Sequence, residues 1–108
     1  MAEYIRNKPL NLDKLKGKVD LTWFGHSGFK IGFLDAEGVQ RAIYIDIWVE
    51  APDCAAELKK ECPNDADLIM VTYGQKDHSF NAPTLLLKGK RDTRKVVCNQ
   101  AYSAYLRA

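Results

Sequence analysis

The chain has 108 residues, of which 46% are hydrophobic and 28% are charged. Such a length holds one domain at most, and such a composition is that of an ordinary soluble globular protein. The formal net charge of +2 is too small to indicate nucleic acid or an acidic membrane surface. No apolar run approaches the roughly 18 residues of a membrane span, and residues 1–6 lack the apolar core of a secretory signal. We therefore expect neither a membrane nor a nucleic acid as partner.

The three cysteines indicate a reducing compartment. Cys54, Cys62 and Cys98 are odd in number and show no C-x-x-C spacing. If Cys54 and Cys62 share one helix, they lie about 12 Å apart along its axis, too far for a disulfide. Free and mostly buried thiols are typical of the cytoplasm, and we expect a cytoplasmic protein.

The chain divides into an arm and one domain. Residues 1–18 are polar and lysine-rich, with a proline and a glycine as breaks, and predict an N-terminal arm. Residues 19–108 make up the single domain. Its last predicted helix, at residues 100–107, has no stop signal before Ala108, so we expect the domain to be incomplete at its C-terminus.

The first half of the domain shows the two-residue period of half-buried strands. We expect strands at residues 20–24, 29–34 and 41–47, with a turn at 25–28 and a hairpin turn at 35–38. In the hairpin turn, Gly38 suits the left-handed conformation that such loops need. In the third strand, two sets of side chains should occupy opposite faces: Ile43, Ile45 and Ile47 on one, Tyr44 and Asp46 on the other.

The second half begins with a helix and a strand. Asp53 should cap a helix over residues 54–61, which Pro63 ends. Residues 68–72 are apolar up to Thr72 and predict a strand buried on both faces. A polar loop at residues 73–78 should follow.

The chain then continues with a helix at residues 81–87, where Pro83 is tolerated in the first turn. A strand at 95–98 and a helix at 100–107, capped by Asn99, complete it. The order β-β-β-α-β-α-β-α predicts the α/β class (α+β by some schemes). We expect a mixed β-sheet with helices on one face.

Three segments carry a recognisable pattern: residues 23–29 (WFGHSGF), 43–48 (IYIDIW) and 67–72 (DLIMVT). In this order they resemble the metallo-β-lactamase superfamily, in particular its ascorbate-phosphate lactonase-like branch. They are similar to the branch's G-H-S opening turn, its I-D-P-W segment and its A-D-L-I-L-V-T strand. The resemblance runs from about Asp20 to Arg107 and implies the N-terminal half of the family's sandwich of two sheets between helices, a half-sandwich.

After the third of these segments, the resemblance places the metal signature T-H-x-H-x-D-H. Tyr73 and Gln75 stand where the first two histidines belong, and only the pair Asp77 and His78 remains. In the family, the H-x-H pair holds one metal ion, the D-H pair helps to hold a second, and both ions activate a bridging water. A glutamine offers only a neutral amide oxygen, and a tyrosine must ionise from a pKa of about 10 to ligate well. We therefore expect no tight metal site, with Asp77 and His78 as vestigial ligands of zinc or another divalent metal.

The resemblance also implies roles for two residues nearer the N-terminus. It places His26 near the pocket, so that His26 and Asp77 are the two candidates for catalytic residues, and it gives Asp46 the role of orienting a metal-ligating histidine. Each residue has a structural alternative: Asp77 can cap the following helix, His78 can be a surface or core histidine, and His26 a turn residue. With the histidines of the signature gone, Asp46 can instead hydrogen-bond near Thr72.

Other polar and aromatic residues favour structural roles. Three tyrosines are expected to pack: Tyr73, Tyr102 and Tyr105. One basic cluster has the charge of a phosphate-binding patch: Lys88, Lys90, Arg91, Arg94 and Lys95. However, Asp92 interrupts the cluster and no aromatic residue interleaves it, so a solvated loop is the prediction.

Two functions remain open. In the first, which Tyr73 and Gln75 favour, a metallo-β-lactamase-like protein with a degraded metal site has no hydrolase activity and acts as a binding or structural module. In the second, Asp77 and His78 bind one ion, and another chain or sequence beyond Ala108 supplies the missing ligands. The metal-bound water then attacks a lactone, ester or phosphoester. A half-sandwich exposes a large apolar face, so we expect self-association or a protein partner over the open sheet.

Overall fold

The computed structural model describes residues 17–59 and 62–107. The arm expected at residues 1–18 therefore lies almost entirely outside the described residues. The described chain forms nine elements: β1 (Asp20–Trp23), β2 (Phe29–Leu34), β3 (Gln40–Ile45), α2 (Ala56–Lys59), β4 (Leu68–Met70), α3 (Lys76–Ser79), α4 (Ala82–Lys88), β5 (Lys95–Val97) and α5 (Gln100–Arg107). Within these residues, no helix has the length and apolar character to cross a membrane.

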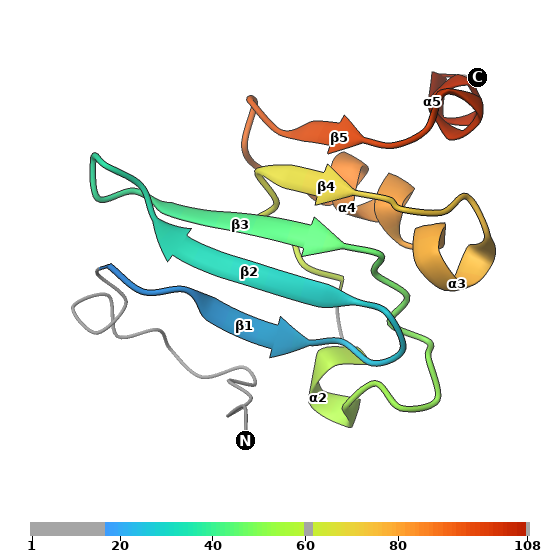
Figure 1. The fold of residues 1–108 in the computed structure, drawn as a ribbon, viewed down its shortest axis with the longest axis horizontal. Coiled ribbons are helices and arrows are strands. Elements are labelled where there is room, and N and C mark those ends of the chain that lie inside the picture. The colour runs from blue at the N-terminus through green and yellow to red at the C-terminus, as the bar shows by residue number, and fades with distance from the viewer. Residues whose placement is uncertain (1–16, 60–61, 108) are drawn as a thin grey trace.

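The strands form one five-stranded sheet in the order β1-β2-β3-β4-β5 (Figure 1). β1, β2 and β3 pair antiparallel, whereas β3–β4 and β4–β5 pair parallel. Tight turns join antiparallel neighbours, but a parallel neighbour requires a longer crossover. The two crossovers contain α2 and then α3 with α4. The mixed sheet with helices confirms the predicted fold class and matches a metallo-β-lactamase-like half-sandwich.

The core lies between the sheet and the helices behind it, where Figure 1 shows α4 behind β4. Its largest fully buried side chains are Tyr44 on β3, Ile69 on β4 and Leu85 on α4. Burying a side chain of this size contributes about 1.5–3 kcal/mol. The Tyr44 hydroxyl donates a hydrogen bond to the Asp65 carboxylate, which Lys30 also contacts at 3.1 Å. This buried phenol therefore keeps a polar partner.

The opposite face of the sheet is apolar, and no described helix lies in front of it in Figure 1. Strand register sets two rows of side chains across it: Leu21, Ile31, Ile43, Leu68 and, at the β5 edge, the exposed Lys95 in one, and Trp23, Phe29, Ile45, Met70 and Val97 in the other. The prediction that the fourth strand is buried on both faces is wrong. Ile69 is buried, whereas Leu68 and Met70 are partly exposed. We call these two rows the open sheet face.

β3 ends earlier than predicted because the backbone changes direction at Asp46. Its φ of 50° lies in the left-handed region, outside the range of a strand. The prediction that Ile43, Ile45 and Ile47 share one face is therefore wrong. Ile47 is buried, whereas Ile43 and Ile45 remain on the partly exposed face.

The helix predicted over residues 54–61 is mostly absent. Within the described residues α2 covers only Ala56–Lys59. Asp53 does not cap it, because its Oδ1 accepts a hydrogen bond from the distant His26 N–H at 2.9 Å. Cys54 lies before the helix, and all three cysteines are free, although only Cys54 is fully buried.

Local signals elsewhere in the chain gave correct predictions. Gly38 has a φ of 80° in the hairpin turn, and Pro83 lies in the first turn of α4. Asn99 Oδ1 accepts a hydrogen bond from the Tyr102 N–H at 2.8 Å, as expected of a helix cap. In each case the residue acts on neighbours within a few positions of the chain.

The basic residues between α4 and β5 are not simply a solvated loop. The Arg91 guanidinium lies 3.2 Å from Asp67 and donates to the Gln40 carbonyl at 2.6 Å. Arg94 donates to the carbonyl of Leu86. Both arginines therefore fasten this segment to neighbouring elements, and the solvated-loop prediction is wrong for them.

Candidate metal centre

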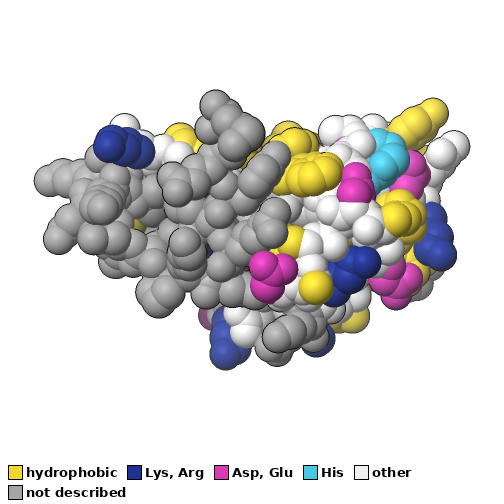
Figure 2. All heavy atoms as spheres, turned by 90° about the horizontal axis from the view of Figure 1, so that it is seen from below, with side chains coloured by type: hydrophobic (Ala, Val, Ile, Leu, Met, Phe, Trp, Pro, Cys, Tyr) yellow, Lys and Arg dark blue, Asp and Glu magenta, His cyan; other side chains and the backbone are white. Residues whose placement is uncertain are grey.

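The strand ends that carry the predicted site residues meet at one end of the sheet. β1 and β3 both run antiparallel to β2, and β4 runs parallel to β3. The carboxyl ends of β1, β3 and β4 consequently lie at the same end. The segments that follow them carry His26, Asp46 and the pair Asp77 and His78. Figure 2 shows histidine at the surface with acidic side chains beside it.

The turn that carries His26 is held from several sides. Gly25 and His26 both have positive φ values, 84° and 47°. A Cβ at Gly25 would lie 2.6 Å from the Cys54 nitrogen, so only glycine allows this close approach. The His26 N–H donates to Asp53, and its carbonyl accepts a hydrogen bond from Trp23 Nε1 at 3.0 Å. His26 is therefore a turn residue, which confirms the structural alternative given for it. Its backbone is fixed by these hydrogen bonds.

The other two site residues lie on α3, where a loop was predicted. The Ser79 hydroxyl donates to the carbonyls of Gly74 and Gln75, each at 2.9 Å, and these bonds hold the helical turn against the preceding loop. Asp77 lies inside this turn, and the residue that precedes α4 is Asn81. The alternative in which Asp77 caps the following helix is therefore wrong.

His26, Asp77 and His78 converge on one point. Oδ2 of Asp77 lies 2.9 Å from Nε2 of His26 and 3.5 Å from Nε2 of His78. One ligand atom from each residue lies within 4.8 Å of the others. The hydrogen bond with His26 lowers the pKa of Asp77, and the nearby His78 acts in the same direction. Two imidazoles and a carboxylate form a donor set that divalent zinc-type ions accept.

Asp46 lies behind His78 and is 4% exposed. Its Oδ2 lies 2.9 Å from Nδ1 of His78. It also accepts a hydrogen bond from the Thr72 N–H at 2.8 Å and another from the Thr72 hydroxyl. Both contacts predicted for Asp46 as alternatives are present: it contacts a histidine ring, and it hydrogen-bonds to Thr72. His78 is a part-buried histidine with a fixed ring, rather than a free surface side chain.

Tyr73 and Gln75 stand where the signature has its first two histidines. Both are exposed, and Tyr73 is 54% exposed, so the prediction that it packs is wrong. The Tyr73 ring lies beside that of His78, with 5.3 Å between centroids. A neutral glutamine amide and a phenol with an ordinary pKa of about 10 are poor replacements for imidazole ligands of a zinc-type ion. The residues present therefore do not fit the two-metal centre that the family signature implies.

Aromatic side chains surround the cluster. The rings of His26 and His78 meet at 65° with centroids 5.7 Å apart. Trp48 meets the His26 ring edge to face, also at 5.7 Å. The Trp48 Nε1 is buried and has no hydrogen-bond partner within the described part of the chain. Trp48 ends the segment 43–48 that resembles I-D-P-W, but no sequence pattern places it against His26.

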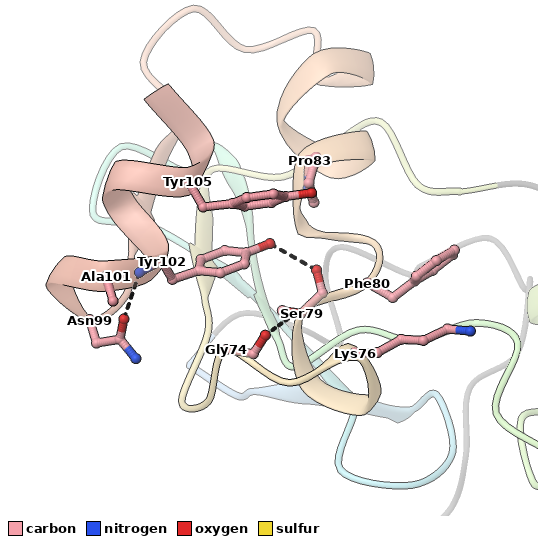
Figure 3. Close-up of a pocket in the computed structure, with 9 residues that line it drawn as sticks. All are labelled: Gly74, Lys76, Ser79, Phe80, Pro83, Asn99, Ala101, Tyr102 and Tyr105. Carbon is pink, nitrogen blue, oxygen red and sulfur yellow. Dashed lines mark hydrogen bonds between the residues drawn. The ribbon is translucent and has the colours of Figure 1, made fainter. Parts of the chain in front are cut away.

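A hollow lies on the α5 side of the α3 loop (Figure 3). It has a volume of about 520 Å³ and is lined by Gly74, Lys76, Ser79, Phe80, Pro83, Asn99, Ala101, Tyr102 and Tyr105. The Tyr102 hydroxyl donates to the Ser79 carbonyl at 3.0 Å, and Asn99 is used as a helix cap. Tyr102 packs as predicted, whereas Tyr105 is 66% exposed. The main polar groups of this hollow thus serve the fold, and it contains none of the ligand cluster.

Comparisons with known proteins give two similar curated relatives. The chain is 34% identical over 62 residues to a UPF0173 metal-dependent hydrolase of Staphylothermus marinus, a match that covers 57% of this chain and 27% of the relative. It is 34% identical over 77 residues to a UPF0173 metal-dependent hydrolase of Herpetosiphon aurantiacus, covering 71% of this chain and 30% of the relative. No family model matches, and no solved structure matches.

Fold and similarity agree on the class of protein. A mixed sheet with helices, and relatives from a metallo-β-lactamase-like family, make the chain metallo-β-lactamase-like, as the three sequence segments predicted. More particularly, it resembles the UPF0173 metal-dependent hydrolases. The chain matches about 30% or less of the length of these relatives.

Proposed function

We propose that this metallo-β-lactamase-like domain has lost the two-metal hydrolase centre and acts as a binding or structural module. One observation carries the proposal: the two positions where the signature has histidines hold Tyr73 and Gln75, a phenol and a neutral amide, and both residues are exposed. A two-metal centre needs ligands for both ions, which then activate a shared water. Without the first pair, that chemistry has no place to occur.

The test compares the native chain with a variant that restores the signature, Tyr73→His with Gln75→His. Both proteins are loaded with zinc, manganese or iron and assayed against lactones, esters and phosphoesters, with Asp77→Ala as the background. We expect the native chain to show no turnover above this background, and the double variant to bind additional metal. Metal-dependent turnover by the native chain that disappears in Asp77→Ala contradicts the proposal. If the double variant binds no additional metal, the loss of the first metal site involves more than these two ligands.

The second candidate function is that of a residual metal-dependent hydrolase. The convergence of His26, Asp77 and His78 favours it, as does the similarity to proteins named metal-dependent hydrolases. A bound ion would supply a water with a lowered pKa. The residues of this chain would hold that ion, and Asp46 would orient His78. Further ligands or substrate contacts would come from another chain or from additional sequence.

The module's partner surface, in this proposal, is the open sheet face, and the occupant is a second copy of the chain. Contiguous apolar side chains on a surface commonly mark protein contacts, and here they come from all strands of the sheet. Sedimentation at tens of micromolar should show a dimer or larger species. Ile31→Lys, in the middle of the face, should release monomers, whereas Val39→Lys, in the exposed hairpin, should not. A native chain that sediments as a monomer contradicts self-association.

A further inference from the structure

We propose that the chain holds one divalent transition-metal ion of the zinc type on His26, Asp77 and His78. His26 lies outside the T-H-x-H-x-D-H signature, so this ligand set differs from the one that the signature implies. The inference does not rest on the proposed loss of hydrolysis, because binding is measured without turnover. It concerns a single ion beside the turn after β1, where the described chain brings three donors together.

The spacing of the donor atoms suits one ion. Bonds of about 2.0–2.1 Å in tetrahedral geometry place neighbouring ligand atoms about 3.4 Å apart. The two distances from Asp77 Oδ2, 2.9 Å to His26 Nε2 and 3.5 Å to His78 Nε2, lie on either side of this value. The donor atoms of the two histidines lie within 4.8 Å of each other, so an ion would draw the side chains of His26 and His78 closer together.

The three donors come from segments that the fold places independently. His26 lies 51 residues before Asp77, and the chain has only two histidines. Both of them are in this cluster. The turn of His26 is fixed by the close approach of Gly25 to Cys54 and by the bond to Asp53. The geometry is thus formed before an ion arrives, which lowers the cost of binding.

The carboxylate behind His78 is a second and separate observation. Asp46 contacts Nδ1 of His78 at 2.9 Å, while Nε2 of the same ring faces Asp77. Histidines that ligate metals usually place their other ring nitrogen against a carboxylate or carbonyl, which fixes the tautomer. Asp46 is buried and also bonded to Thr72. It is a positioning residue, not a ligand.

The donor set defines the kind of ion. Two imidazole nitrogens and one carboxylate oxygen suit zinc, cobalt or nickel better than magnesium or calcium, which prefer oxygen ligands. Three protein ligands leave a fourth position for water or a ligand. The side chains of His26 and Asp77 are 43% and 35% exposed, so this fourth position faces solvent.

The test is calorimetric titration of the chelator-stripped chain with zinc chloride, followed by elemental analysis. We expect one ion per chain. His26→Gln, Asp77→Asn and His78→Gln should each weaken zinc binding at least tenfold. The matched control is Asp92→Asn, an exposed carboxylate away from the cluster, and it should bind like the native chain. Unchanged affinity in His26→Gln, two ions per chain, or equal loss in Asp92→Asn overturns the proposal.

A spectroscopic measurement on the unaltered chain covers the case in which a variant fails to fold. Nitrogen NMR of the two imidazoles, with and without zinc, reports each ring nitrogen separately. We expect zinc to shift Nε2 of both His26 and His78, and the proton on His78 to remain on Nδ1 beside Asp46. A shift at His78 alone, or at neither residue, overturns the proposal. Hydrolysis assays stay independent of this result, so the failure of one proposal is distinguishable from the failure of the other.

Discussion

The two ends of the β2–β3 strand pair are each held by one aspartate, and the two aspartates act over very different distances along the chain. At the hairpin end, Asp35 Oδ1 accepts hydrogen bonds from the N–H groups of Glu37 and Val39, both at 2.9 Å. Arg41 Nε donates to its other oxygen at 3.0 Å. All partners lie within six residues. The carboxylate stabilises the turn in which it sits.

At the site end, Asp46 bonds to residues far along the chain. Thr72 and His78 lie 26 and 32 residues after it. It joins the end of β3 to the end of β4 and to α3, and it sets the ring of a candidate ligand. The difference teaches that a carboxylate at a strand end can serve a local turn or connect separate segments into a site. Burial distinguishes the two cases, because Asp46 is 4% exposed and Asp35 is not buried.

The largest contrast between the two ends should appear when a methyl group is added to a glycine of each turn. Gly25 and Gly38 have similar φ values, 84° and 80°, but a Cβ at Gly25 would meet Cys54 and one at Gly38 would meet nothing within 4 Å. The left-handed conformation costs alanine about 1–2 kcal/mol at both. The clash should raise the loss at Gly25→Ala to about 3 kcal/mol or more.

Urea unfolding of Gly25→Ala and Gly38→Ala measures this difference, and zinc titration of both shows whether the turn carries the site. We expect only Gly25→Ala to lose zinc affinity, because it displaces His26. Equal losses of stability in the two variants would mean that the turn moves away from Cys54 without cost.

The next contrast removes the connecting carboxylate. Asp46→Ala leaves the Thr72 N–H and the His78 ring without their partner, and the loss of such a buried acceptor costs about 2–3 kcal/mol. Chemical denaturation measures the stability, and hydrogen exchange should show faster opening at Thr72. A variant as stable as the native chain would show that Asp46 does not join the two strand ends.

The smallest expected effect is the pH dependence of the stability that Asp35 contributes at the hairpin end. Hydrogen bonds from the Val39 N–H, and also from Arg41 and Glu37, lower the pKa of Asp35. Its contribution to stability is therefore complete above the unfolded pKa of about 3.9 and is lost as pH falls through the lower folded pKa. Asp35→Asn should be less stable than the native chain at pH 7, and the gap should close in strong acid. Denaturation at a series of pH values tests this, and a gap that is constant with pH contradicts it.

Much of the fold was predictable because its signals are local. The alternation over Phe29–Leu34 fixes β2, and Gly38, Pro83 and Asn99 act on near neighbours. The ends of β3 and α2 were predicted wrongly, since Asp46 takes a left-handed conformation and Asp53 bonds to a remote turn. Tertiary contacts decide both positions, and no local pattern reveals them.

The candidate site was predictable only in part, because tertiary contacts decide which of its residues meet. The Asp77 and His78 pair follows from the signature, and Asp46 from the resemblance. The closeness of His26 to Asp77 depends on strand register across the sheet and on the turn at Gly25. The fact that the chain has only two histidines was the available hint. The helical turn α3 was missed because it has only four residues.

The aromatic surroundings of His26 have an optical consequence. The chain has two tryptophans, and both touch this residue: Trp23 Nε1 donates to its carbonyl, and the Trp48 indole meets its ring edge to face. Tryptophan fluorescence excited near the red edge of absorption therefore originates wholly next to the candidate ion. The intact chain thus contains its own reporter, whose emission should change when His26 is occupied, without any attached dye.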